Sequence, residues 1–345
     1  MKNYKKNISF LFYFKLFQIL LILFIIFINE NIKIEYFKET NDIDDFQKDR
    51  YLINKNHSKL DYENNIFVIL KRNYCPFCGF FSNYCVFIEC VIPFIMKGYI
   101  PIMDLNAYGN IYNNFKPNTS ENPWELYFQQ PFGYKLNEVK NKSKKIKYYK
   151  CSKKVKSYYN IYNNKIIIQF WHIIAKNYFP LKKIMIKKAN TIRKKLFKNS
   201  KNVLGILIRG TDFISLKLQG HPRPPKSEIV IRDVKVMHKK NKYKFFFLAT
   251  EDDLIRVKFK NEFGNKIKFL QYKRKINWNY NSKTFLGQNS LLIGNQEFTE
   301  IYILNIIILS KCLDIIGGLC NGLFGAFVIS NGFRNTKIYD LGTYK

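Results

Sequence analysis

The sequence is poor in cysteine, glycine, proline and acidic residues. Seven cysteines among 345 residues are too few for a disulfide-dense secreted scaffold. With 16 glycines and 10 prolines the chain is not collagen-like, and with 47% hydrophobic residues it is not disordered. At roughly 100–200 residues per domain, we expect a globular chain with about two domains.

The shortage of acidic residues leaves the chain strongly basic. Lysine and arginine number 58 against 25 aspartates and glutamates, a formal net charge of +33. Only nine of the 58 are arginine, the residue that nucleic-acid readers favour, so we expect no nucleic-acid partner. The excess of Lys, Asn, Ile, Tyr and Phe is typical of an AT-rich coding sequence. The alternative is an anionic partner: a sugar nucleotide, an acidic polysaccharide or an anionic lipid surface.

A long hydrophobic run occupies residues 9–28, where only Lys15 and Gln18 are strongly polar. As a helix it would span about 30 Å, one hydrocarbon thickness. Lysines precede it and mixed charges follow, so the positive-inside bias places residues 1–8 in the cytoplasm and the body on the far side. A cleaved signal peptide is the alternative, but no small-x-small site follows. We expect a single-pass membrane anchor, followed by a stem over residues 29–64.

Beyond the stem, apolar strands alternate with helices. In the first part we expect strands at 66–72 and 99–105, a helix at 79–97 and a helical run over 166–198. Between them, residues 113–134 are expected to be loop-rich, and the basic residues 140–156 a solvated face.

The second part repeats strand and helix in short steps. The expected strands are 203–208, 244–249, 266–271, 313–316 and 336–341, and the expected helices are 226–240, 252–263, 298–310 and 322–331. Such alternation predicts an α/β fold with a parallel, doubly wound sheet. Ligands bind to such sheets just beyond the carboxyl ends of the strands.

Polar residues gather at those strand ends. Residues 203–208 are followed by Arg209, Gly210, Thr211 and Asp212. A guanidinium at a strand end suits a phosphate, because its fork matches two oxygens, and glycine lets the backbone approach closely. The alternative is that Arg209 simply pairs with Asp212.

Three further strand ends carry polar groups. His221, in a proline-fixed loop, is either a general base or hydrogen-bond donor, or a cap on the next helix. Thr250 is expected to be the N-cap of the following helix, with Asp253 completing a capping box, in addition to any nucleotide contact. The glycine-rich turn at 317–322 either offers amides to an anion or only packs tightly.

In this order the blocks resemble a known family. They are Gly205-x3-Arg209-x-Thr211-Asp212, His221-Pro222, Leu248-Ala249-Thr250-x-Asp252 and Leu304-x5-Ser310. They are similar to the donor half of the α-1,6-fucosyltransferase and O-fucosyltransferase-like superfamily. They are closer still to glycosyltransferases found with bacterial surface-polysaccharide genes. The resemblance covers residues 203–342, about 40% of the chain.

The resemblance implies a metal-independent glycosyltransferase of the GT-B type, with two Rossmann-like domains. Residues 65–198 would form the acceptor-side domain and residues 199–345 the nucleotide-sugar-binding domain. It implies no cofactor, a GDP-sugar such as GDP-fucose as donor and a surface glycan as acceptor. Arg209 would bind the diphosphate, Asn305 matches an acidic residue that contacts guanine, and the family's diphosphate-binding serines fall near residues 319–321.

The chemistry of such a transfer defines the expected site. The leaving diphosphate needs cations and amides, and the acceptor hydroxyl needs a base. Arg209 would be the cation, and Asp212, His221 and Glu251 are the candidate bases. The remaining donor contacts are expected from Gly210, Thr211, Thr250, Asp252, Asn305, Cys320, Asn321 and Gly322. No metal ligand is expected.

The sequence departs from the family pattern around the arginine and at the last turn. Leu207 stands where a histidine often occurs, and Gly210 replaces a second arginine. At residues 318–322 Cys320 and Asn321 replace a serine-rich turn. A catalytically inactive protein that keeps the fold is therefore an alternative.

A Cys-x-x-Cys pair, Cys75 and Cys78, lies between an expected strand and an expected helix. A helix N-terminus lowers a thiol pKa, so this placement suits a redox pair, and a thiol-disulfide oxidoreductase is the alternative function. With Cys85 and Cys90 the pair could instead hold zinc, although the spacing is not a usual one. Otherwise these two face the core. In a two-domain glycosyltransferase, residues 75–83 would face the cleft and touch the acceptor.

Overall fold

The computed structural model describes residues 60–151, 162, 165–272, 279, 286 and 296–345. All of these residues belong to one compact unit, residues 59–345. The expected cytoplasmic tail 1–8, the hydrophobic run 9–28 and residues 29–59 of the expected stem lie outside the described residues. Within the described ranges, no helix is long and apolar enough to cross a membrane.

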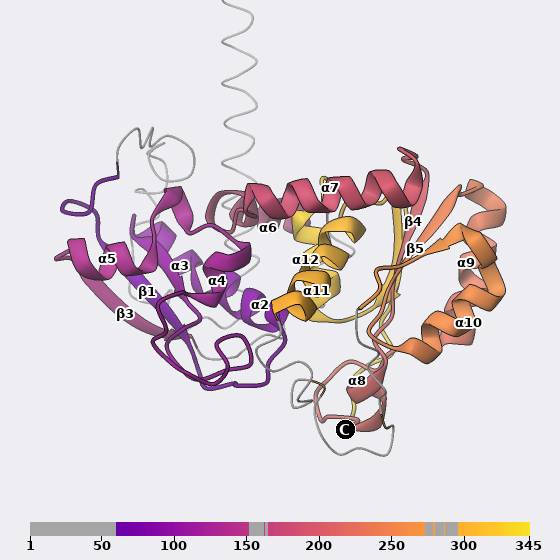
Figure 1. The fold of residues 1–345 in the computed structure, drawn as a ribbon, viewed down its shortest axis with the longest axis horizontal. Helices are drawn as coiled ribbons and strands as arrows, with labels where there is room; N and C mark the ends of the chain where they lie inside the picture. Colours follow the sequence, from indigo (N-terminus) through magenta and orange to yellow (C-terminus); the bar gives the residue numbers. More distant parts are fainter. Residues whose placement is uncertain (1–59, 152–161, 163–164, 273–278, 280–285, 287–295) are drawn as a thin grey trace, which may run out of the picture. The chain divides into compact units, whose positions relative to one another are not determined.

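The described part contains two parallel sheets, which confirms the α/β fold predicted from the alternation of strands and helices (Figure 1). The first sheet has the order β2-β1-β3, with strands β1 (Phe67–Arg72), β2 (Ile100–Asp104) and β3 (Ile146–Cys151). The second has the order β6-β5-β4-β7-β8, with strands β4 (Val203–Leu207), β5 (Phe245–Ala249), β6 (Ile267–Lys268), β7 (Asp314–Gly318) and β8 (Thr336–Tyr339).

In each sheet the chain starts at an inner strand and then adds strands on both sides. In the first sheet, β2 joins one side of β1 and β3 the other. In the second, β5 and β6 extend from one side of β4, and β7 and β8 from the other. The order therefore reverses between β1 and β3 and again between β4 and β7. In open α/β sheets, the carboxyl ends of the strands at such a switch point form the ligand-binding crevice.

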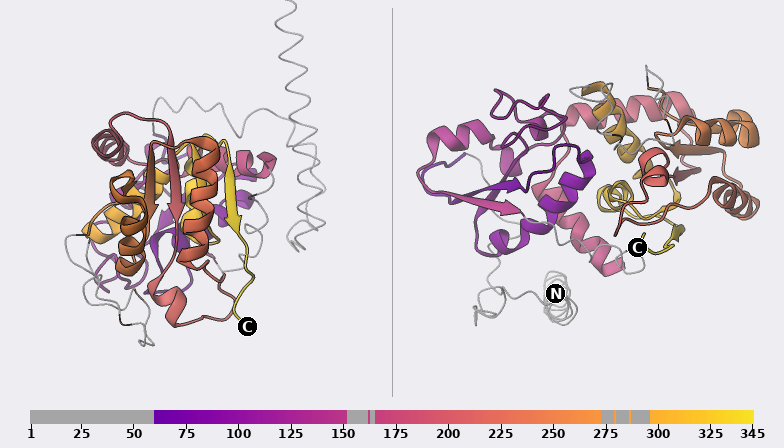
Figure 2. Two further views of the ribbon diagram at one scale, coloured as in Figure 1. Left: turned by 90° about the vertical axis from the view of Figure 1, so that its right-hand side faces the viewer. Right: turned by 90° about the horizontal axis from the view of Figure 1, so that it is seen from below.

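Helices cover both faces of the second sheet (Figure 2). Helices α9 (Ser227–Asn241) and α10 (Asp253–Phe263) cover one face, and α11 (Gln296–Leu309) and α12 (Asn321–Ile329) the other (Figure 1). Side chains of α9 and α10 join those of β4, β5 and β7 in one buried apolar cluster. On the opposite face, a Cβ on Gly205 would meet Leu309 at 3.0 Å, so α11 approaches the sheet closely there.

The first sheet is accompanied by helices α2 (Phe80–Cys90), α3 (Ile92–Met96), α4 (Pro123–Tyr127), α5 (Leu136–Lys142), α6 (Lys165–Tyr178) and α7 (Lys183–Phe197). Trp124 is fully buried and stacks on Phe80 and Phe128 at centroid distances of 5.7 and 4.8 Å. Helix α2 also packs on α12, where Gly325 lies against the ring of Phe81. Aromatic packing thus links α2 both to its own half and to α12.

Three of the predictions for the first part need correction. The expected single helix at 79–97 is interrupted at Val91, and Pro93 follows within α3. Residues 146–151 form strand β3 inside the stretch expected to be a solvated basic face. Lysines there lower the apparent strand propensity, but β3 is an edge strand, where exposed lysines are tolerated. Helix α4 and a short 3-10 turn, Pro131–Gly133, also occur in the expected loop 113–134.

A charged cluster at the switch point of the second sheet

Arg209 follows β4 and is held by two carboxylates, Asp212 of helix α8 (Thr211–Ser215) and Glu251 of the loop after β5. Its Nε donates to Glu251 Oε1 at 3.1 Å, and its Nη2 to Asp212 Oδ1 at 3.3 Å. The guanidinium also lies 4.3 Å from the ring centre of Phe213, and the side chain is 20% exposed. Burial alone would lower the pKa of Arg209, but Glu251 and Asp212 outweigh it and raise the pKa, so the group stays cationic. The pairing with Asp212 considered from the sequence is therefore present.

Glu251 ties the end of β5 to the end of β4. Its Oε1 accepts hydrogen bonds from the Arg209 Nε, from the Gly210 amide at 2.9 Å and from the Thr211 hydroxyl at 3.1 Å. These three bonds join the end of β5 to the residues that follow β4. Glu251 therefore holds the loop after β4 in place, a role that the sequence did not separate from that of a base.

The loop after β4 depends on Gly210. A Cβ at this position would overlap the carboxylate of Asp252, so no larger residue fits. The next residue, Thr211, has a φ of 41°, and its amide donates to Asp252 Oδ2 at 3.2 Å. The glycine that replaces the family's second arginine is thus required by the close approach of Asp252.

The prediction that Thr250 caps the helix after β5 is wrong. Helix α10 begins at Asp253, and its N-cap is Asp252, whose Oδ1 accepts from the amides of Leu254 and Ile255 at 2.9 and 3.1 Å. Thr250 is buried at the end of β5, where its hydroxyl accepts from the Asp252 amide at 3.2 Å. The carboxylate of Asp252 therefore both caps α10 and fixes the loop after β4.

The other two candidate bases differ in how far they are engaged. Asp212 accepts through Oδ1 from Arg209 and Thr211 and through Oδ2 from the Leu286 amide at 3.1 Å. The ring of His221 packs against Phe213 at 5.6 Å, so Phe213 contacts both the guanidinium and the imidazole. The backbone of His221 bonds to Leu218 and Tyr344. Asp212 is thus committed to the arginine loop, whereas His221 lies beside it.

The end of β7 faces the same cluster. Cys320 is the N-cap of α12, and its Sγ accepts from the Leu323 amide at 3.4 Å. Burial raises the pKa of the Cys320 thiol, and the nearby charge of Arg209 lowers it only in part. Because Leu207 of β4 pairs with Gly317 of β7, Arg209 and the start of α12 both follow the same edge of the sheet, at the switch point between β4 and β7. The backbone carbonyl of Asn321 accepts from Cys85 Sγ of α2 at 3.9 Å.

Tyr302 of α11 also belongs to the cluster, although the sequence analysis did not find it. Its hydroxyl lies 3.1 Å from where a Cβ on Gly322 would stand. Burial raises its pKa, and the charge of Arg209 opposes that rise only in part, so the hydroxyl stays protonated. In the sequence, nothing marks Tyr302 as a site residue except its position on α11, three residues and about one turn before Asn305.

Asn305 lies next to this cluster, in a buried position. Its side chain is hydrogen-bonded to Tyr272, which stacks on Phe298 at 4.6 Å. The amide oxygen of Asn305 is buried and has no hydrogen-bond partner in the described part of the chain. Tyr272 also interacts electrostatically with Glu251 and Arg209, so the amide and the stacked rings adjoin the arginine.

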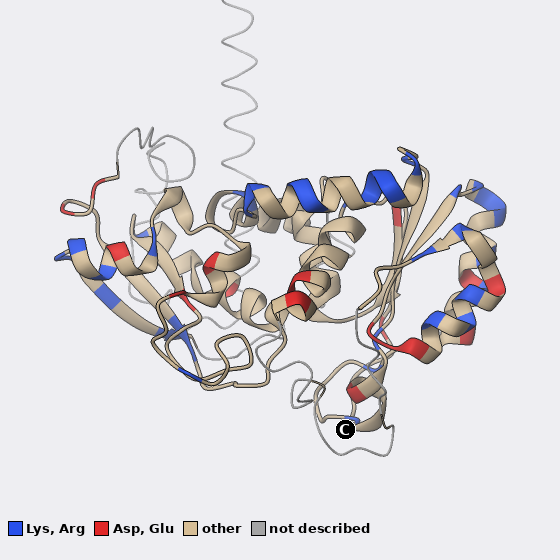
Figure 3. Cartoon of the chain, in the orientation of Figure 1, with Lys and Arg blue, Asp and Glu red and all other residues tan. Residues whose placement is uncertain are grey.

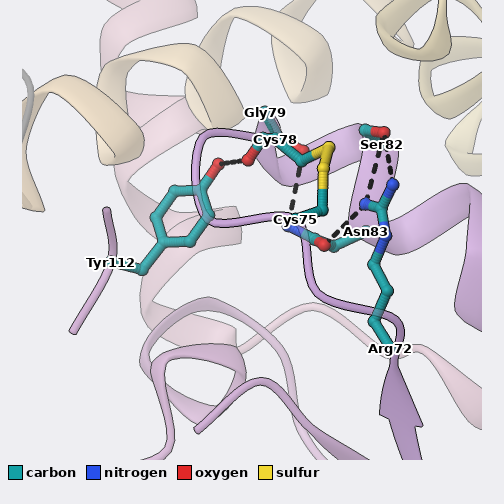
Figure 4. Close-up of a disulfide and its surroundings, with 7 residues drawn as sticks. All are labelled: Arg72, Cys75, Cys78, Gly79, Ser82, Asn83 and Tyr112. Atoms are coloured by element: carbon teal, nitrogen blue, oxygen red, sulfur yellow. Dashed lines mark hydrogen bonds between the residues drawn. A yellow bond between two sulfur atoms is a disulfide. The ribbon is translucent and has the colours of Figure 1, made fainter. Parts of the chain in front are cut away.

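The Cys-x-x-Cys pair lies between β1 and α2, as predicted, and forms a disulfide (Figure 4). The Tyr112 hydroxyl donates to the carbonyl of Cys78 at 2.8 Å. Cys85 is buried, as expected, whereas Cys90 is half-buried and hydrogen-bonded to Cys151. Thiols joined in a disulfide are not zinc ligands, and no group of three or more potential metal ligands occurs among the described residues.

No protein-family model matches the chain, and no curated protein matches it. Solved structures do match. One is the α-1,6-fucosyltransferase NodZ, an enzyme whose structure from Bradyrhizobium also matches. The NodZ structure soaked with GDP-fucose is 12% identical to this chain. The match covers 77% of this chain and 93% of that chain, with a TM-score of 0.43. Arabidopsis thaliana FUT1 in complex with GDP is 9% identical, covering 83% and 72%, with a TM-score of 0.40. POFUT1 in complex with GDP-fucose is 9% identical, covering 79% and 73%, with a TM-score of 0.36. The chain is thus similar to structures of fucosyltransferases, the class that its sequence blocks resemble.

Proposed function

We propose that the protein is a metal-independent glycosyltransferase of the GT-B type that takes a sugar, fucose being the first candidate, from a GDP-sugar and transfers it to a surface glycan. The observation that carries this proposal is the position of Arg209. It lies at the switch point of the second sheet, opposite the N-terminus of α12, where cation and helix amides can share one anion.

In this proposal Arg209 and α12 bind the donor diphosphate. The acceptor hydroxyl attacks the anomeric carbon, the bond from that carbon to the phosphate oxygen breaks, and the diphosphate leaves with the electron pair. Arg209 supplies the positive charge that stabilises the leaving group, and the protonated Tyr302 is placed to donate a hydrogen bond. The unpartnered amide oxygen of Asn305 and the stacked rings beside it suit the nucleobase.

The base in this proposal is His221. Glu251 and Asp212 both hold Arg209 and also accept from the Gly210 and Leu286 amides, respectively, so we assign them positioning roles. The imidazole lies beside Arg209, because both groups contact the ring of Phe213, and histidine side chains ordinarily titrate near neutrality. It would take the proton of the acceptor hydroxyl as the new glycosidic bond forms.

The wider organisation is proposed from the sequence. Residues 65–198 would be the acceptor-side domain, with residues 75–83 near the acceptor, and residues 199–345 the donor-side domain. Residues 9–28 would anchor the enzyme in a membrane with its N-terminus in the cytoplasm.

The test is calorimetric titration of the full chain with GDP, UDP and CDP in the absence of metal ions. We expect GDP to bind, and Arg209→Ala to weaken that binding by about 10- to 100-fold, as for a lost charge-assisted contact. The matched control is Arg232→Ala, which removes an exposed arginine from α9. If well-folded protein binds no nucleotide, or if both variants bind equally, the donor-site assignment is wrong.

The inactive alternative is separated by turnover. An enzyme releases free sugar from GDP-fucose slowly even without acceptor, and His221→Ala should reduce this release while leaving GDP affinity unchanged. If GDP binds and wild-type protein releases no sugar at high protein concentration, the chain is a nucleotide-binding relative without catalysis.

A further inference from the structure

A pocket occurs at the switch point of the first sheet, far along the sequence from the cluster around Arg209. It has a volume of about 340 Å³ and is lined by Lys71, Arg72, Tyr74, Ala107, Tyr108, Tyr148, Tyr149 and Lys150. These residues come from the carboxyl ends of β1 and β3 and from the loops after β1 and β2. The volume lies at the lower end of the range of small-ligand sites. The pocket therefore occupies the position where a parallel sheet is expected to bind a ligand.

The cations in this pocket face no carboxylate among its lining residues, because Asp104, the register partner of Lys71 on β2, is buried and pairs with Lys140. Lys71 and Lys150 are register partners on neighbouring strands, so their side chains share one face of the sheet. Like charges in this arrangement repel one another. Neither lysine has an ion-pair partner in the described part of the chain, and none of the residues lining the pocket is acidic. Figure 3 shows basic residues along β3. An anion between the two ammonium groups would relieve the repulsion.

The pocket also presents aromatic rings to solvent. Tyr148 is 59% exposed, and Lys71 Nζ lies 4.8 Å from its ring centre. Tyr74 is 74% exposed and lies 5.8 Å from the ring of Tyr108. An exposed tyrosine offers both an apolar face and a hydroxyl. The C–H faces of a sugar ring pack on such a surface, while its hydroxyl and acidic groups meet polar partners.

The wall of the pocket is fixed in advance. Arg72 is 5% exposed, and its Nη1 donates to Asn83 Oδ1 at 2.7 Å and to Ser82 Oγ at 3.3 Å (Figure 4). The disulfide between Cys75 and Cys78 closes the loop that follows Tyr74. Arg72 and this loop are therefore held before a ligand binds, whereas the exposed side chains of Tyr74 and Tyr148 become ordered on binding.

We propose that this pocket binds an anionic saccharide, whose carboxylate or sulfate lies between Lys71 and Lys150 and whose sugar ring packs on Tyr148 and Tyr74. That this saccharide is the acceptor glycan rests on the proposed transferase function; the binding itself does not. A neutral sugar would leave the two lysines unbalanced. The bases of a nucleic acid would also stack on the rings, but nucleic-acid sites favour arginine. Only nine of the 58 basic residues are arginine, and Arg72 is the one arginine lining the pocket, so we favour the saccharide.

The test measures direct binding of saccharides to the full chain by calorimetry, with no nucleotide present. The probes are a galacturonate tetrasaccharide, which carries only carboxylates, a sulfated heparin-derived tetrasaccharide, the neutral chitotetraose and a short oligothymidylate. The variant is Lys71→Gln/Lys150→Gln. The control is Lys142→Gln/Lys147→Gln, which removes the same charge from α5 and from the alternate face of β3.

We expect at least one acidic tetrasaccharide to bind about tenfold or more tightly than chitotetraose. Comparison of the uronate with the sulfated sugar identifies which acidic group the pocket takes. The pocket variant should weaken this binding by about tenfold, and the control by less than about twofold. The proposal fails if both variants weaken binding equally, if chitotetraose binds as tightly, or if oligothymidylate binds tighter than either acidic sugar and through the same lysines.

Failure here is distinguishable from failure of the proposed function. If GDP binding depends on Arg209 but the pocket takes no acidic sugar, the transferase proposal stands and its acceptor is of another class. If acidic saccharides bind through Lys71 and Lys150 but no nucleotide binds, the pocket stands and the protein is not a transferase of the proposed kind.

Discussion

The two switch points of this chain handle charge in opposite ways. At the second sheet, Arg209 is neutralised by Glu251 and Asp212, and each carboxylate also accepts from a backbone amide, that of Gly210 or of Leu286. At the first sheet, Lys71 and Lys150 lie side by side with no described carboxylate between them.

The two sites differ in how rigidly their cations need to be held. A leaving diphosphate must be met by a cation already held in place, since reorganisation during the reaction would cost rate. The carboxylates of Glu251 and Asp212 hold Arg209 in this way, but their negative charge also weakens the attraction of Arg209 for phosphate. An acceptor site has no such requirement, so its lysines can stay unbalanced until an anion arrives. The predictions below alter one side of this comparison at a time.

The largest effect is expected from Glu251→Ala. The change leaves the Arg209 guanidinium, the Gly210 amide and the Thr211 hydroxyl without their common acceptor in a buried site. We expect unfolding to become easier by about 3 kcal/mol and GDP binding to be lost. Urea denaturation followed by circular dichroism measures the first effect. Glu251→Gln, which keeps an acceptor oxygen, should recover part of the stability, and Glu121→Ala at an exposed position should cost almost nothing.

The next largest effect concerns the helix that carries Cys320. A Cβ on Gly325 would overlap the ring of Phe81, so Gly325→Ala forces α12 away from α2. Overpacking of this kind costs about 2 kcal/mol, although alanine normally favours a helix. The control is Gly79→Ala, where a Cβ meets nothing within 4 Å and the backbone φ of −60° suits any residue. Equal thermal stability of the two variants would show that α2 and α12 do not pack as described.

A smaller effect on stability is expected at the switch point of the first sheet, where Cys75→Ser/Cys78→Ser removes the disulfide after β1. Loss of so short a disulfide loop should lower the free energy of unfolding by about 1–2 kcal/mol in the chain-entropy model. Acidic-saccharide binding should weaken modestly, because the loop after Tyr74 is no longer closed. Sugar transfer should persist, since neither thiol takes part in it. A thiol-disulfide oxidoreductase would behave otherwise: the double variant would lose all exchange activity toward a dithiol, and no nucleotide would bind.

The strand ends were predictable from the sequence because strand–helix alternation and the switch-point rule place residues by order alone. Arg209, Asp212, Glu251 and Cys320 come together for this reason. What order cannot specify is which atoms each carboxylate meets. Glu251 and Asp212 look alike as candidate bases in the sequence, and only the structure shows which donors their oxygens meet.

Other features escaped prediction because the local signal was opposed by tertiary context. Strand β3 is rich in lysine, yet it pairs along its full length with β1. Threonine is a common N-cap residue, but α10 begins at Asp253, so Asp252 and not Thr250 is its N-cap. Tyr302 belongs to no motif, and its place in the cluster follows only from how α11 packs against α12.

The last effect depends on pH and concerns Glu89 of α2, a buried carboxyl in the first half that no described cation balances. Its Oε1 is buried without a hydrogen-bond partner in the described residues, and burial raises its pKa from 4.5 to about 8. The native state therefore binds a proton that the unfolded chain releases between about pH 4.5 and pH 8, and stability falls as pH rises through that window. Glu89→Gln removes this dependence, so the variant should match wild type near pH 4 and be more stable than wild type near pH 9. Urea midpoints at the two pH values measure the difference, with Glu63→Gln as an exposed control. A constant offset between variant and wild type at both pH values would mean that Glu89 is ionised in the folded protein, and the first half would then hold a compensating cation after all.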